Sequence, residues 1–133
     1  MKKRSIVLAV FVLLSLFCLA GCVRYSSSYS AVASVRTNTS NTAALSFYQF
    51  KGRMVFKLKC RDSNIGQLSY SAKLDSGNLT VYVDHDGTKR ELVSLKSGDN
   101  ISSSVSEISK GNVYIIIETD GRCEEGSFRF DLK

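Results

Sequence analysis

The stretch NLTVYVD, residues 78–84, decides the fold because apolar and other residues alternate strictly along it. In an extended chain, successive side chains point to opposite faces, so one face here is wholly apolar. That face carries Leu79, Val81 and Val83, while Tyr82 lies on the other face. A period of two therefore predicts a β-strand with one face in a core and one face in water.

The same alternation recurs on both sides of this stretch. It is found in RMVFKLKC (53–60), QLSYSAKL (67–74) and SFRFDLK (127–133). NVYIIIETD (112–120) differs, because Val113 to Ile117 is apolar on both faces. A strand of that kind is expected at the centre of a sheet and covered on both sides.

Glycine-containing turn signals separate these segments. They are Lys51-Gly52, Ser76-Gly77-Asn78, Asp86-Gly87, Ser97-Gly98-Asp99, Lys110-Gly111, Asp120-Gly121 and Glu125-Gly126. Strands that recur every 8–12 residues with turns between them are typical of sandwiches. The sequence therefore predicts an all-β fold over residues 44–133, a single antiparallel β-sandwich of about eight strands with a jelly-roll-like arrangement.

The N-terminus has the pattern of an export signal. Lys2, Lys3 and Arg4 precede an apolar run of about 14 residues, which as a helix would span roughly 21 Å and is short for a bilayer core. The run ends in Leu19-Ala20-Gly21-Cys22, which resembles the lipobox of bacterial lipoproteins. The resemblance implies removal of residues 1–21, a diacylglyceryl thioether on Cys22, and a lipid-anchored protein on the extracytoplasmic face of a cell membrane.

Residues 22–43 are rich in Ser, Thr, Asn and Ala and show no sustained period. This composition predicts a flexible tether between the lipidated Cys22 and the sandwich. Loss of the three basic signal residues lowers the formal net charge from +6 to +3. No run of clustered Lys or Arg remains, so nucleic acid is not an expected partner.

Two cysteines remain after Cys22. Outside the cytoplasm Cys60 and Cys123 can oxidise to a disulfide, and closing a loop of about 63 residues would stabilise the fold by roughly 4 kcal/mol. The alternative is that Cys60 is a buried thiol and Cys123 a loop thiol that points elsewhere. We expect the disulfide.

The second half of the chain carries a looser resemblance. The order of strand and turn signals over residues 66–133, from GNLTVYVD to GSFRFDL, is similar to that of pre-peptidase C-terminal-type domains. These are small accessory β-sandwiches attached to secreted enzymes. The resemblance supports the architecture and implies no activity of its own.

The sequence contains few residues that could form a catalytic or metal-binding site. The one histidine, His85, falls in the turn signal DHDG, where we expect a solvated side chain. Asp84 and Asp86 could begin a calcium loop, but Lys89 and Arg90 follow where further oxygen ligands would be needed. No catalytic residue, metal or cofactor is therefore predicted, and the protein is not expected to be an enzyme.

Tyrosines offer the best candidates for binding. Tyr82 and Tyr114, with Tyr48 as a further candidate, fall in phase with the outward faces of their strands. Aromatic rings on a sheet can stack on sugars or contact proteins, although packing between strands explains them equally well. The sequence predicts a non-catalytic binding or accessory module for a glycan or a protein. The alternative is a structural lipoprotein that assembles with other envelope proteins.

Overall fold

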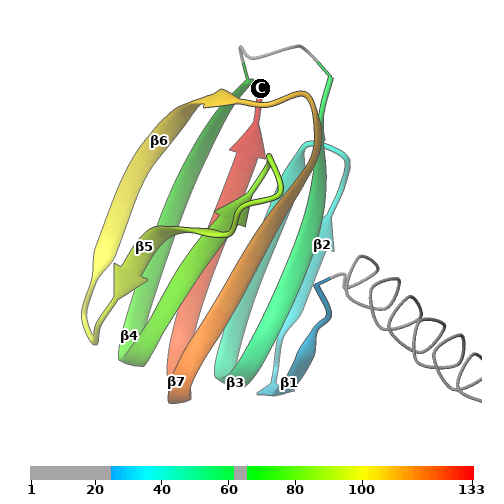
Figure 1. Ribbon diagram of the computed structural model, residues 1–133. Coiled ribbons are helices and arrows are strands. Elements are labelled where there is room, and N and C mark those ends of the chain that lie inside the picture. Colours follow the sequence, from blue (N-terminus) through cyan, green and yellow to red (C-terminus); the bar gives the residue numbers. More distant parts are fainter. Residues whose placement is uncertain (1–24, 62–65) are drawn as a thin grey trace, which may run out of the picture.

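The computed structural model describes residues 25–61 and 66–133, which form seven strands and no helix. The strands are β1 (Ser28–Val32), β2 (Val35–Asn38), β3 (Thr42–Cys60), β4 (Gly66–Asp84), β5 (Arg90–Leu95), β6 (Asn100–Ile108) and β7 (Gly111–Leu132). The prediction of an all-β antiparallel sandwich is confirmed (Figure 1). Accordingly, no helix in this described part is long and apolar enough to cross a bilayer.

A single sheet supplies both layers of the sandwich. Its order is β1-β3-β7-β4-β5, with β2 also beside β3 and β6 also beside β4, and all pairs are antiparallel. The long strands β3, β4 and β7 bend near their middles, so the sheet folds over on itself (Figure 1). The first layer holds residues 42–50, 66–74 and 123–132 with β2 and β6. The second layer holds residues 53–60, 78–84 and 111–120 with β5.

The bends in β3 and β4 lie where the pairing with β7 changes register, and a glycine is found at each of these places. The register between β3 and β7 shifts between Phe50 and Arg53, and that between β4 and β7 shifts between Ser76 and Asn78. Gly52 (φ +123°) and Gly77 (φ +112°) occupy these two places in backbone conformations that L-residues rarely adopt. The prediction that these two glycines form turns between separate strands is wrong. Each of these glycines lies inside one bent strand, β3 or β4, and the described residues form seven strands where about eight were expected.

The core lies between the two layers. Phe50, Phe56, Phe128 and Phe130 are its largest fully buried side chains. β7 lies between β3 and β4 over nearly its whole length, and three consecutive residues, Ile115 to Ile117, are fully buried. The prediction of a central strand covered on both sides is therefore confirmed.

Part of the predicted tether belongs to the sheet. β1 and β2 pair with β3 in one continuous register, interrupted at Ala33, which has a positive φ of 50°. The side chain of Arg36 also donates to the carbonyl of Val55 at 2.8 Å, across the edge between the layers. The tether predicted for residues 22–43 is thus wrong for residues 28–38. The composition of residues 28–38 did not predict this pairing because nearly all of their side chains stay exposed and show no apolar period.

The two cysteines lie at opposite ends of the sandwich. Cys60 is in register with Gly111, where β3 ends and β7 begins. We call this end of the sandwich, which lies away from the bends, the open end. The Sγ of Cys60 lies 3.7 Å from the carbonyl oxygen of Ile108. Cys123 is in register with Phe50 at the bend end, and its thiol donates to the carbonyl of Asn78 at 3.3 Å. The intervening strand of eight residues spans about 25 Å. The predicted Cys60–Cys123 disulfide, which needs Cα atoms within about 7 Å, is therefore wrong.

Substituting Gly77→Ala tests the bend. A Cβ there would lie 2.8 Å from the Sγ of Cys123 and 2.9 Å from the carbonyl oxygen of Arg122. Backbone strain and this overlap together should lower the free energy of unfolding by about 2–4 kcal/mol, measured by urea denaturation. Gly98→Ala is the control, because Gly98 also has a positive φ but an added Cβ meets nothing within 4 Å. Equal losses in the two variants would show that the close approach at the bend is unimportant.

Candidate functional site

The outer face of the second layer carries a shallow groove near the bend end. Its volume is about 310 Å³, and Tyr82 is the aromatic side chain in its lining. The polar and charged residues of the lining are Asn78, Thr80, Ser94, Lys96, Glu118, Thr119 and Asp120. An aromatic ring surrounded by hydrogen-bonding groups is the composition of a binding site for a polar ligand with one apolar face.

Charged residues lie close to Tyr82. The ammonium of Lys89 lies 4.3 Å from the centre of the Tyr82 ring, a cation–π contact. The same ammonium lies 2.9 Å from Oε1 of Glu118, and Nε of Arg53 lies 2.9 Å from that oxygen. Burial acts to raise the pKa of Glu118, but its bonds to Lys89 and Arg53 outweigh burial and hold the pKa below the usual value. Glu118 is therefore a carboxylate at neutral pH, bound by two cations.

Tyr114 lies on the same outer face but outside the lining of the groove. Its ring contacts that of Tyr25, with 5.3 Å between ring centres and 57° between planes. The Tyr25 hydroxyl donates to Oδ2 of Asp84 at 2.5 Å, and the N–H of Gly87 donates to Oδ1 at 2.8 Å. Both side-chain oxygens of Asp84 therefore accept a hydrogen bond. The residue is also buried, with 6% of its surface exposed.

An apolar floor separates the two tyrosines. Ile116 points outward from the second layer yet is fully buried, and in register it lies between Val55 and Tyr82. Its burial shows that neighbouring side chains cover the middle of this face. The outer face of the second layer is therefore apolar and covered around Ile116, and it carries the polar groove near the bend.

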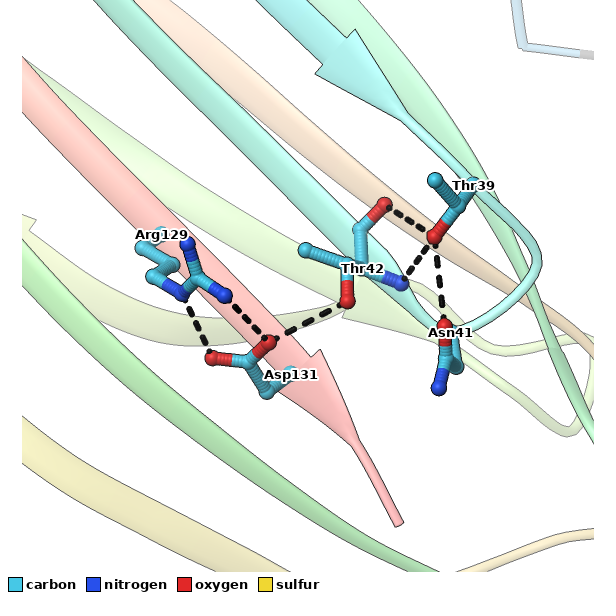
Figure 2. A network of polar contacts seen from close by, with 5 residues as sticks. All are labelled: Thr39, Asn41, Thr42, Arg129 and Asp131. Atoms are coloured by element: carbon cyan, nitrogen blue, oxygen red, sulfur yellow. Dashed lines mark hydrogen bonds and ion pairs between the residues drawn. The ribbon is translucent and has the colours of Figure 1, made fainter.

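The outer face of the first layer carries a network of polar contacts between β3 and β7. Figure 2 shows Arg129 donating from Nε to Asp131 at 2.9 Å, while the hydroxyl of Thr42 donates to the same carboxylate at 3.2 Å. The Thr39 hydroxyl accepts from the N–H of Thr42 at 3.0 Å and closes the turn between β2 and β3. Tyr48 lies on this layer with 53% of its surface exposed, so it does not join Tyr82 and Tyr114.

His85 is not the solvated turn residue that we expected. It is half-buried, and its Nδ1 accepts from the backbone N–H of Ser109 at 3.0 Å and lies 2.9 Å from the Ser109 hydroxyl. It thereby ties the turn after β4 to the turn before β7. Across residues 25–61 and 66–133, no group of three or more His, Cys, Asp or Glu side chains could hold a metal ion.

Tyr82 and Tyr114 were predicted as candidate binding residues from the sequence, whereas two of their neighbours in the structure were not. Tyr25 falls in a polar segment with no period, and nothing local marks its contact with Asp84, a residue 59 positions away. Glu118 could have been found, because it is in phase with Tyr114 and Ile116 on the outward side of β7. Cys22, Leu19-Ala20-Gly21 and the signal segment 1–21 lie outside the described residues.

No protein-family model matches the chain, and no curated protein matches it. Among solved structures, the carbohydrate-binding module TmCBM61, in complex with β-1,4-galactotriose, aligns with 80% of this chain and 87% of its own at 16% identity and a TM-score of 0.51. This likeness supports the β-sandwich fold.

Two other structures align with lower scores, too low to add to the argument. PliG of Aeromonas hydrophila, a periplasmic inhibitor of g-type lysozyme, aligns with 71% of this chain and 88% of its own at 10% identity and a TM-score of 0.46. The pre-peptidase C-terminal domain of a Bacillus anthracis collagenase aligns with 80% and 89% at 11% identity and a TM-score of 0.44.

The Tyr25–Asp84 hydrogen bond predicts a pH dependence of stability. The bond to the carboxylate, with burial, raises the pKa of Tyr25 from 10.0 to about 12. Stability from this bond is therefore complete below pH 10 and is lost as the pH rises from 10 to 12. Tyr25→Phe should lower the free energy of unfolding by about 1 kcal/mol at pH 7, and the gap to the unsubstituted protein should shrink between pH 10 and 12. The control is Tyr48→Phe, and a constant gap for Tyr25→Phe up to pH 12 would contradict the assignment.

Proposed function

We propose that this protein is a bacterial envelope lipoprotein whose β-sandwich is a non-catalytic glycan-binding module. Residues 1–21 are removed, Cys22 carries the lipid, and the domain lies on the extracytoplasmic face of the membrane. The lipobox with its basic and apolar flanks supports the anchor. The groove at Tyr82 supports the binding role and is the observation that carries the proposal.

The groove suits a sugar for a chemical reason. A pyranose presents an apolar face of C–H groups and a rim of hydroxyls, which match an aromatic ring with polar neighbours. Thr80, two residues before Tyr82 on β4, lies between Ser94 on β5 and Glu118 on β7, so two hydroxyls and a carboxylate line the groove near the ring. A ligand stacked on Tyr82 would take the place of the Lys89 ammonium above the ring, and the long flexible stem of that lysine allows it to move aside.

The choice of a first ligand follows from the comparison. TmCBM61 was solved with β-1,4-galactotriose, so this oligosaccharide is the first probe for the groove. The identity of 16% transfers no binding residue, and the probe therefore serves as a starting point for a wider set of neutral and charged glycans.

A second candidate function, assembly with another envelope protein, is favoured by a different surface. Four large apolar side chains are exposed on β1, β2 and the first half of β3, namely Tyr29 (45%), Val32 (52%), Val35 (66%) and Tyr48 (53%). Val35 is the most exposed of them and lies on an edge strand of the sheet. Val35 is in register with Ser46 and lies on the same outer face of the first layer as Tyr48, so these two side chains can pack against a partner away from the groove.

The anchor is tested by Cys22→Ser. A serine hydroxyl cannot form the thioether, so the variant should leave the membrane fraction or remain an uncleaved precursor. Fractionation and mass spectrometry of the N-terminus measure both outcomes. Cys123→Ser is the matched control, because Cys123 is buried inside the domain and should leave membrane attachment unchanged. A cleaved Cys22→Ser protein that stays on the membrane would contradict the anchor.

The groove is tested by Tyr82→Ala. Losing the stacked ring should weaken glycan binding by about 2- to 12-fold, from roughly 0.5–1.5 kcal/mol per aromatic contact, measured by isothermal titration calorimetry. Tyr48→Ala removes an exposed tyrosine from the other layer and should bind normally. Tyr114→Ala separates the two tyrosines, and we expect a smaller effect because Tyr114 lies outside the groove. If all three variants bound the glycan with the same affinity, the groove at Tyr82 would be excluded as the glycan-binding site.

A further inference from the structure

The N-terminal segment is fixed to the outer face of the second layer before the first strand begins. Tyr25 reaches Asp84 through its hydroxyl and Tyr114 through its ring. The hydroxyl of Ser27 accepts from the backbone N–H of Val55 at 2.9 Å. Only three Cα–Cα intervals separate Tyr25 from Cys22 in the sequence. In any conformation this length of chain spans at most about 11 Å.

A basic cluster lies next to this attachment. We define it as Lys57, Lys59, Arg61 and Lys110, all of which are exposed. Lys57 is in register with Tyr114, the residue that contacts Tyr25, and Lys59 follows on the same face towards the open end. Lys59 and Arg61 line one cleft there, and Lys110 precedes Gly111, the partner of Cys60.

This cluster is not neutralised by the rest of the described chain. None of the four side chains forms an ion pair within residues 25–61 and 66–133, although Arg53, Lys89, Arg90 and Arg129 all do. The nearest carboxylate in the same row of the sheet, Asp84, is buried and already accepts from Tyr25 and Gly87. The four side chains carry a formal charge of +4, or +3 when Asp62, the residue after Arg61 in the sequence, is also counted.

We propose that the basic cluster rests on the anionic surface of the membrane that holds the lipid, so that the sandwich stands on its open end. The proposal rests on the proposed lipid anchor at Cys22. Because the groove at Tyr82 extends to Asn78 and Asp120 at the bend end, this orientation turns the groove away from the bilayer. The bound module then presents its ligand site to the space beyond the membrane.

We infer that the basic cluster binds a bilayer because the lipid on Cys22 would keep the membrane surface close to it. Two acyl chains on Cys22 would keep the bilayer surface close to Tyr25, and Lys57 lies one strand away from the Tyr25 contact at Tyr114. Each basic residue near an anionic surface adds about 1 kcal/mol of attraction, or roughly 5-fold in population. Three net charges are enough to select one orientation of a domain already confined to the surface.

The test uses the full lipidated protein in vesicles of phosphatidylcholine with or without phosphatidylglycerol. A fluorophore is placed on Asn112→Cys at the open end or on Glu124→Cys at the bend end, both exposed positions. A quencher attached to lipid headgroups then reports which end lies at the surface, and flotation reports membrane attachment separately. We expect several-fold stronger quenching at position 112 than at position 124 with phosphatidylglycerol, and a ratio near one without it or at high salt.

Charge-reversal variants assign the effect to the cluster. Lys57→Glu, Lys59→Glu and Arg61→Glu together should bring the ratio to about one while flotation is unchanged. The matched control reverses Lys51, Lys73 and Arg122, three exposed basic residues at or near the bend end, and should keep the ratio high. Equal quenching at both positions in floating protein, or a ratio that ignores lipid charge, would overturn the orientation and leave the anchor standing. Protein that fails to float would overturn the anchor, and the orientation with it.

Discussion

The structure depends on the way that β3, β4 and β7 bend together. Each of these strands belongs to both layers, so the two halves of the sandwich are joined by continuous hydrogen-bonded sheet as well as by the core. Gly52 and Gly77 allow the bend because the backbone of a neighbouring strand occupies the space where a Cβ would lie. The bend sets which residues of each strand face each other across the core, and it places the groove at Tyr82 beside the fold of the sheet.

The period-two pattern was sufficient to predict the fold class and most of the strand positions. Alternation identified the core faces of residues 53–60 and 78–84, and the unbroken run Val113–Ile117 identified the central strand. It could not show whether Gly77 ends a strand or bends it, because both outcomes place the same residues on the core face. The edge strands β1 and β2 were missed for a related reason: a polar segment gains its pairing from β3 and carries no signal of its own.

The candidate site was predictable only in part. Tyr82 and Tyr114 follow from strand phase, but phase does not show that Tyr82 lines the groove and that Tyr114 packs on Tyr25. Both facts arise from long-range contacts, as does the separation of Cys60 from Cys123 by the length of the second layer. The N-terminal segment links the site to the proposed lipid, since Tyr25 is at once part of the outer face and a close neighbour of Cys22 in the chain.

The central claim is that the outer face of the second layer binds ligand. An NMR titration of the isotope-labelled protein with β-1,4-galactotriose and a panel of further glycans tests it most directly. The account predicts saturable shifts in the amides of Thr80, Tyr82, Ser94 and Glu118 for at least one glycan, with those of Ser71 and Arg129 on the first layer unchanged. Shifts confined to the first layer, or the absence of any saturable shift across the panel, would contradict it.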